Sequence, residues 1–162
     1  MATPGPVRVR RVVTGVDRSG RSVILADGEA PTVMPEGPDY VGYQIVELWK
    51  TRTTPPDLSG EDFTAEPFEL DPVPGGVNWR VTVWPPVEVR SRIHKTDTVD
   101  LVYILSGTVY VGVGDDETSL VETLLSPGDS IVALGNMHSW RNPGPDPCVA
   151  VATMVSSIPL SD

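Results

Sequence analysis

The sequence predicts an all-β protein that folds as a single antiparallel β-barrel or jelly roll. Glycine and proline supply 15 and 17 of the 162 residues, and both interrupt long helices and mark turns. Roughly ten short runs rich in β-branched residues lie between these turn signals, with no heptad pattern and no internal repeat. Regular short strands joined by turns are typical of sandwiches and barrels. A chain of this length is one domain's worth and can bury a core.

Two short strands are expected near the N-terminus, over residues 7–13 and 21–25. Between them, residues 17–20 read Asp-Arg-Ser-Gly, which is the chemistry of a tight turn. The two strands are therefore predicted to pair as an N-terminal hairpin. A further strand is predicted over residues 43–49.

The long segment over residues 53–76 is rich in proline, glycine and acidic residues and has no sustained hydrophobic period. It is predicted to be a surface loop, with one short turn of helix over residues 59–63. A loop of this length is uncommon in a compact domain unless it covers something. Residues 1–76 are therefore assigned to the same domain as the rest, as N-terminal strands and a covering loop.

The second half of the chain, residues 77–162, is predicted to be the barrel core. Its strands are expected over residues 77–84, 101–105, 108–113, 119–125, 130–134, 138–142 and 148–155. Ser106 and Gly107 are predicted to form a tight hairpin turn between the second and third of these strands. Further turns are predicted over residues 114–117 and 126–129, where glycine, aspartate and proline gather.

The charge of the chain excludes whole classes of partner. There are 12 basic and 22 acidic residues, which gives a formal net charge of −10. Nucleic acids and anionic membrane surfaces are polyanions, so neither is an expected partner. No apolar run approaches the ~20 residues that a bilayer-spanning helix needs.

The single cysteine, Cys148, cannot form an internal disulfide. The first residues of the chain lack the apolar core of a signal peptide. Together these features favour a reducing, cytoplasmic setting. Cys148 stands beside Val149 and Ala150 and is expected to be a small core residue.

The chain has 2 histidines, His94 and His138, and both lie in its strand-rich second half. Asp100 follows shortly after His94. On one unbroken strand, His94 and Asp100 would lie about 20 Å apart at roughly 3.3 Å per residue, too far to bind one ion together. The short polar stretch over residues 95–98 allows the chain to reverse. Asp100 is then expected to begin a strand that runs back beside the first.

The stretch around His94 resembles the first motif of the cupin family. That motif places two histidines two residues apart, then a glutamate, then a glycine seven residues after the acid. His94 matches the first histidine, Asp100 the acid and Gly107 the glycine. Thr96 stands where the family has its second histidine.

A later stretch resembles the second cupin motif, in which a strand leads from a glycine to a histidine and an asparagine follows. Gly128, His138 and Asn142 match it, with Gly135 as the internal glycine, although the interval to the histidine is one residue short and Leu134 replaces a proline. The resemblance covers about residues 77–155. It implies a small antiparallel barrel with two packed sheets.

The resemblance implies a metal site formed by His94, Asp100 and His138, with all three side chains pointing into the barrel. Two imidazoles and one carboxylate suit divalent Fe, Mn, Ni or Zn. Thr96 in place of a histidine leaves the coordination sphere more open, which favours substrate coordination and weakens retention of the ion. The alternative is a barrel without metal, in which both histidines are hydrogen-bonded polar residues.

Thr96, Trp140, Arg80 and Asn142 are further candidates for lining the cavity. The two-residue period of a strand turns Trp140 and Asn142 to the side of His138. Trp140 is either an aromatic wall for a flat ligand or a filler of the core. Asn142 is expected to satisfy backbone groups of a turn rather than to touch substrate.

Arg80 shares one strand face with Thr82 and Trp84. If it points inward, it can bind a carboxylate or phenolate through two parallel hydrogen bonds. If it points outward, it is a solvated strand residue, and this is the interpretation that we favour. Tyr103 is out of phase with Asp100 and is expected on the opposite face of its strand.

The cupin resemblance implies a metal-dependent enzyme that acts on a small organic substrate, such as an oxo-acid or a polyketide-like compound. The ion would act as a Lewis acid in lyase, isomerase or cyclase chemistry, for example dehydration or decarboxylation. The alternatives are an Fe(II)-dependent oxygenase of the same fold and a non-catalytic small-molecule-binding cupin. A second copy of the chain is the expected protein partner, in a homodimer paired through edge strands.

Overall fold

The computed structural model describes residues 5–37 and 40–159. Its strands are β1 (Arg10–Val16), β2 (Ser22–Glu29), β3 (Thr32–Val33), β4 (Gln44–Thr51), β5 (Val77–Trp84), β6 (Thr98–Ser106), β7 (Val109–Val113), β8 (Val121–Leu125), β9 (Ser130–Leu134), β10 (His138–Arg141) and β11 (Cys148–Ser156). Within these described ranges, no helix has the length and apolar character needed to cross a membrane.

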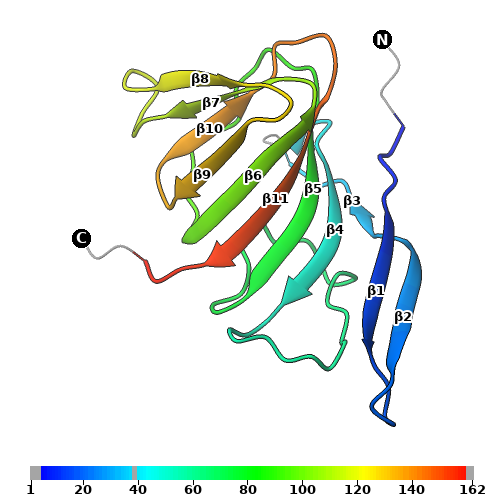
Figure 1. Ribbon diagram of the computed structural model, residues 1–162. Coiled ribbons are helices and arrows are strands. Elements are labelled where there is room, and N and C mark those ends of the chain that lie inside the picture. The colour runs from blue at the N-terminus through cyan, green and yellow to red at the C-terminus, as the bar shows by residue number, and fades with distance from the viewer. Residues whose placement is uncertain (1–4, 38–39, 160–162) are drawn as a thin grey trace.

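The strands form three antiparallel sheets (Figure 1). The largest has the order β3-β4-β5-β11-β6-β9, the second has the order β10-β7-β8, and β1 pairs with β2. One buried cluster joins the two larger sheets, with Trp84 from β5, Ile104 from β6, Val111 from β7 and Trp140 from β10. Because side chains of both sheets meet in that cluster, the sheets pack face to face. The predicted all-β barrel or jelly roll is confirmed.

The alternation of burial along β6 fixes which side chains enter the barrel. Asp100, Val102 and Ile104 are buried, whereas Leu101 and Tyr103 between them are exposed. Successive side chains of a strand point to opposite faces, so Asp100 faces the interior with the apolar core residues. The prediction that Tyr103 lies on the opposite face from Asp100 is confirmed.

The predicted N-terminal hairpin is present and stands beside the barrel, where β1 and β2 pair only with each other (Figure 1). Arg11 attaches it, because its Nη1 donates to the carbonyl of Leu48 at 3.1 Å and to Oγ1 of Thr64 at 3.0 Å. Val7 and Val9, which precede β1, pack on a second apolar cluster on β4 and β5. The N-terminal segment therefore covers part of the larger sheet.

Three local predictions are wrong. Residues 59–63, all of them described, form no helical turn. The hairpin predicted at Ser106 and Gly107 does not form, because β6 and β7 belong to different sheets. The strand that begins near Asp100 does not run back beside the strand of His94, because His94 bridges to His138 and β6 pairs with β11 and β9. The short β3 is absent from the predicted strands.

Gly107 makes the crossing from one sheet to the other feasible. Its φ is +70°, and a Cβ atom there would meet the carbonyl oxygen of Pro147 at 2.3 Å. We expect Gly107→Ala to lower the free energy of unfolding by at least about 1 kcal/mol, because left-handed backbone and overpacking both cost energy. Urea denaturation measures this. Gly28→Ala is the control, since a Cβ at Gly28 meets nothing within 4 Å; equal losses in both variants would contradict the prediction.

Cys148 is fully buried in the core cluster that joins the two larger sheets, as predicted. Burial raises the pKa of its thiol to about 11. Because the thiolate is the reactive form, we expect a thiol-specific reagent to leave the folded protein unmodified and to label it fully in denaturant. Rapid labelling under native conditions would contradict this packing.

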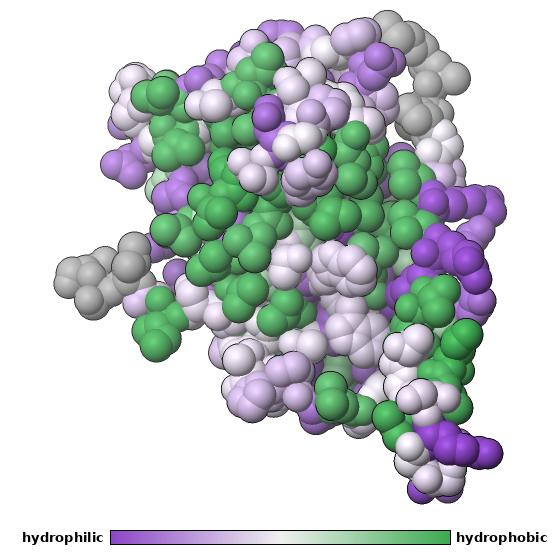
Figure 2. Space-filling model, in the orientation of Figure 1, coloured by the Kyte–Doolittle hydropathy of each residue, from purple (hydrophilic) through white to green (hydrophobic). Residues whose placement is uncertain are grey.

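Apolar side chains also remain on the outer surface of the barrel. Leu101, Tyr103 and Leu105 on β6, with Val132 and Leu134 on β9, are all at least 45% exposed. Figure 2 shows apolar surface over the middle of the molecule, where Figure 1 places the larger sheet. The homodimer stays a prediction, which a single-chain mass in light scattering would contradict.

Candidate functional site

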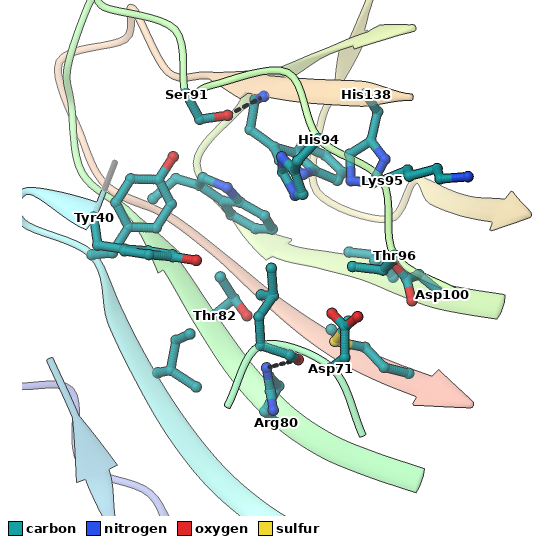
Figure 3. Close-up of a pocket in the computed structure, with 18 of the residues that line it drawn as sticks. Tyr40, Asp71, Arg80, Thr82, Ser91, His94, Lys95, Thr96, Asp100 and His138 are labelled. Atoms are coloured by element: carbon teal, nitrogen blue, oxygen red, sulfur yellow. Dashed lines mark hydrogen bonds between the residues drawn. The ribbon is translucent and has the colours of Figure 1, made fainter. Parts of the chain in front are cut away.

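The barrel holds a cavity of about 300 Å³ between its two sheets. One side of the cavity is aromatic and is formed by Tyr40, Tyr43, Trp84 and Trp140. The other side is polar and is formed by His94, Thr96, Asp100 and His138, with Asp71 at the mouth (Figure 3). Four of the seven predicted site residues thus meet at one end of the cavity, and Arg80 and Trp140 also line it.

The backbone brings the two histidines together. His138 begins β10, and His94 lies in the preceding segment as an isolated bridge opposite it. The amide of His94 donates to the carbonyl of His138 at 2.9 Å, and the amide of His138 donates back at 2.8 Å. The two ring centroids are 4.6 Å apart. Residues far apart in the sequence therefore form a pair of neighbouring imidazoles.

Each imidazole is held by a hydrogen bond to a backbone carbonyl. Nδ1 of His94 lies 2.9 Å from the carbonyl oxygen of Arg92, and Nδ1 of His138 lies 2.9 Å from that of Asn136. A carbonyl oxygen only accepts, so both Nδ1 atoms carry the proton. In the neutral rings, Nε2 keeps its lone pair and is free to accept a proton or to bind a ligand.

Thr96, Thr98 and Asp100 form a short hydrogen-bonded chain. The Thr98 hydroxyl donates to Oδ1 of Asp100 at 2.6 Å, and Oγ1 of Thr96 lies 2.6 Å from Oγ1 of Thr98. A hydroxyl has one proton, so Thr98 accepts from Thr96. The threonine at the family's second histidine position is thus buried and linked to the acidic residue of the motif.

The ionisable groups of the cavity are shifted by burial. Desolvation raises the pKa of Asp100, and the hydrogen bond from Thr98 and the charge of His138 oppose the shift. Desolvation also lowers the pKa of His138, which favours its neutral form. The pKa of Asp71 is raised first by partial burial and then by the negative charges of Asp100 and Asp97. Perturbed groups of this kind gather at functional sites.

Arg80 anchors the long loop at the mouth of the cavity. It is 1% exposed, so the expectation that it is solvated is wrong. Its Nη2 lies 3.2 Å from Oε1 of the equally buried Glu47, and it donates to the carbonyls of Leu70 at 3.0 Å and Glu69 at 3.2 Å. The buried Glu47 carboxylate explains the difference, because it holds the guanidinium inside the protein.

The long loop contributes Leu70 and Asp71 to the cavity lining, as expected of a loop that covers something. Asp71 was not predicted from the sequence, because nothing local distinguishes it from the other acidic residues between positions 53 and 76. The length of the loop was the one available signal.

Trp140 belongs to the core and also borders the cavity. It is 9% exposed, is part of the core cluster and lines the cavity, so it fills the core, and its role as a wall for a flat ligand stays a prediction. Its ring centroid lies 4.9 Å from that of Trp84 and 5.8 Å from that of His138, whose ring is nearly perpendicular to it. Thr82 and Trp84 line the cavity together with Arg80, as their shared strand face predicted.

Asn142 was proposed as a cavity candidate, but it does not line this cavity. Its Nδ2 donates to the carbonyls of Trp84 at 3.2 Å and Asp146 at 2.9 Å, and its Oδ1 accepts from the amide of Gly144 at 3.0 Å. These bonds match the expected role in a turn.

A divalent ion needs several donor atoms arranged around one point. Over residues 5–37 and 40–159, no group of three or more His, Cys, Asp and Glu side chains is arranged to hold a metal. His94, Asp100 and His138 share one cavity but do not form a three-ligand centre. The two imidazoles by themselves have the required chemistry, because a carbonyl fixes each Nδ1 proton and leaves Nε2 as the donor atom.

Comparison with solved structures assigns the fold. The cupin domain of Cnp3 from Schizosaccharomyces pombe is similar over 91% of this chain and 88% of its own, with a TM-score of 0.54 and 10% identity. A putative ethanolamine utilization protein Q from Salmonella typhimurium is similar over 94% of this chain and 99% of its own, at a TM-score of 0.49 and 10% identity. The similarity to the Cnp3 domain shows that the chain has the cupin fold, as its motifs predicted.

The structure of Fe(II) HppE is also similar to part of this chain. It matches 48% of this chain and 43% of its own, with a TM-score of 0.41 and 18% identity. No protein-family model and no curated protein matches this chain.

Proposed function

We propose that the cavity is the active site of an enzyme that transfers a proton on a small organic substrate, in lyase, isomerase or cyclase chemistry. The observation that supports this proposal is the pairing, inside one partly enclosed cavity, of a buried imidazole with a free Nε2 and a buried carboxylate. The aromatic side would hold the body of the substrate. The side chains at the polar end would transfer the proton.

His138 is the base in this proposal. Its burial favours the neutral ring, and its Nδ1 proton is committed to Asn136, so Nε2 can take a proton from a carbon next to a carbonyl. The C–H bond breaks, the proton moves to Nε2, and the electron pair forms an enolate. Return of the proton to another carbon completes an isomerisation, and departure of a leaving group completes an elimination. Asp100, with its raised pKa, stands in the same cavity as a second proton carrier.

If the site instead held a divalent Fe, Mn, Ni or Zn ion, Nε2 of His94 and of His138 would be its ligands, and Asp100 rather than His138 would have to carry the proton. The ion would supply Lewis-acid polarisation of a carbonyl oxygen. The oxygenase alternative needs a carboxylate beside the two imidazoles, whereas His94, Asp100 and His138 are not arranged as three ligands of one ion. Small-molecule binding without catalysis is the remaining alternative, and the aromatic side of the cavity supports it equally well.

Metal content separates these alternatives. The protein is purified without a histidine tag and its metals are measured by mass spectrometry. Stoichiometric metal that is lost in His94→Ala and in His138→Ala supports a metal at the imidazole pair. A protein that cannot be loaded with any of the four ions contradicts it. Turnover without oxygen would exclude the oxygenase.

Proton transfer is tested without knowing the final product. The protein is incubated in D2O with a panel of enolisable ketones, oxo-acids and amino ketones, and proton NMR follows the loss of the signals next to each carbonyl. Exchange faster than the protein-free rate supports the proposal. Compounds that bind without any faster exchange contradict it and favour the non-catalytic binding protein.

A further inference from the structure

The polar end of the cavity presents hydrogen-bond acceptors. Nε2 of His94 and of His138 accept, because both Nδ1 protons are bound to carbonyls. The Thr96 hydroxyl donates its proton inward to Thr98, so its free lone pairs can only accept. Asp100, when ionised, also has accepting capacity beyond its bond from Thr98. Acceptors from three separate segments thus converge on one end of the cavity.

Three basic residues, Arg80, Arg92 and Lys95, line the cavity. Arg80 is buried and is directed at Glu47 and at the carbonyls of Glu69 and Leu70. Arg92 and Lys95 are exposed, and Figure 3 shows the Lys95 side chain extending away from Asp71. Asp71 adds a second carboxylate at the mouth, and Figure 3 shows that carboxylate on the side of the cavity where Thr96 and Asp100 lie.

The functional groups of small molecules differ in how well they can bind to these hydrogen-bond acceptors. A carboxylate would bring negative charge beside Asp71 and Asp100, where like charges disfavour binding. A hydroxyl has one proton and two lone pairs. It could donate to one acceptor of the cavity, but its lone pairs would face the lone pairs of the other acceptors. A primary ammonium has three donors, no acceptor and a positive charge. Of these groups, only the ammonium combines donors alone with a positive charge.

The opposite side of the cavity restricts the rest of the ligand. Tyr40, Tyr43, Trp84 and Trp140 form an aromatic lining, and the ring centroids of Trp140 and His138 lie 5.8 Å apart. Aromatic faces bind flat apolar groups and also attract nearby cations. The cavity therefore has an apolar half and an acceptor half within about 300 Å³.

We propose that the cavity binds a primary amine carried on a flat apolar body, with the ammonium at Thr96 and Asp100, beside the two imidazoles. This inference deepens the proposed function, because it names the substrate class of the same site. It replaces the oxo-acid expected from the cupin resemblance with an amine, and it places the amine's charged group beside the proposed base.

Two probes of similar size and opposite charge test the proposal. Calorimetry compares 2-phenylethylamine with 3-phenylpropanoate, using protein that has been dialysed against EDTA, at neutral pH and low salt. We expect the amine to bind at least about tenfold more tightly than the acid, because only the acid meets like charge. Equal binding of the two, tighter binding of the acid, or no binding of the amine would overturn the proposal.

Three variants locate the amine. Asp100→Asn should weaken amine binding by about tenfold, since it removes a buried charge at the acceptor end. Asp71→Asn should weaken it less, because Asp71 is exposed at the mouth. Asp115→Asn, in the exposed turn between β7 and β8, makes the same change of net charge outside the cavity. A loss in Asp115→Asn as large as in Asp100→Asn would overturn the assignment.

The experiments distinguish a failure of the amine-binding proposal from a failure of the proposed function. Tight amine binding without deuterium exchange would support the amine as the ligand and contradict the proposed proton transfer. Deuterium exchange confined to oxo-acids, with weak amine binding, would support the proposed proton transfer and contradict the amine as the ligand. Thermal unfolding of each variant confirms that a loss of binding is not a loss of fold.

Discussion

Replacement of Arg80 by methionine is expected to lower the free energy of unfolding by about 3–5 kcal/mol. The guanidinium lies 3.2 Å from the Glu47 carboxylate, and both residues are 1% exposed. Methionine keeps much of the apolar stem but leaves Glu47 with Lys50 as its remaining cationic neighbour, 3.6 Å away. It also removes the donors to the carbonyls of Glu69 and Leu70. Urea denaturation followed by tryptophan fluorescence measures the loss.

The control for Arg80→Met is Arg10→Met, which breaks a two-bond arginine–aspartate pair on the exposed hairpin. Solvent screens that pair, so the unfolding midpoint should stay nearly unchanged. Adding Glu47→Gln to the Arg80 variant should restore part of its stability, because it removes the uncompensated buried charge. An Arg80→Met loss as small as that of Arg10→Met would show that the buried pair contributes little.

The substitution His138→Asn is expected to slow deuterium exchange by about 10²–10⁴-fold, the range ascribed to a positioned general base. Asparagine can still donate to the carbonyl of Asn136, which now accepts from Nδ1 at 2.9 Å. It has no basic atom at the place of Nε2. The loss should therefore appear in the rate of exchange rather than in the stability or in the binding of the probe.

Glu117→Gln, in an exposed turn, is the control for His138→Asn and should exchange at the wild-type rate. Should His138→Asn retain the wild-type rate with the most reactive compound of the panel, His138 would not be the base. Asp100 would then be the group to substitute next.

The parts of the fold that local patterns specify were predictable from the sequence. The strands over residues 77–84 and 130–134 have their predicted bounds, and the hairpin across Asp17 forms. The assignment of strands to sheets was not predictable from turn chemistry. A glycine at positive φ serves a hairpin and a crossing equally well, and Gly107 makes the crossing because β7 pairs with β10 and β8.

The candidate site, like the fold, was predictable from the sequence only in part. His94, Asp100 and His138 were identified because motif spacing records positions along the chain. Their distances from one another depend on the pairing of His94 with His138 and on the placement of Asp100 in the other sheet, which no local pattern encodes. The burial of Arg80 depends on Glu47, and the position of Asp71 depends on a loop held by Arg80. These contacts form only in the folded protein, so local sequence patterns do not predict them.

The separation of the β1–β2 hairpin from the barrel has a consequence for motion. Its strands pair with no other strand, and a two-stranded ribbon is marginally stable by itself. Its backbone amides should therefore exchange with solvent through local opening, at lower free energy than those of β5, β6 and β11. The contacts of Arg11 with Leu48, Asp62 and Thr64 should oppose this local opening.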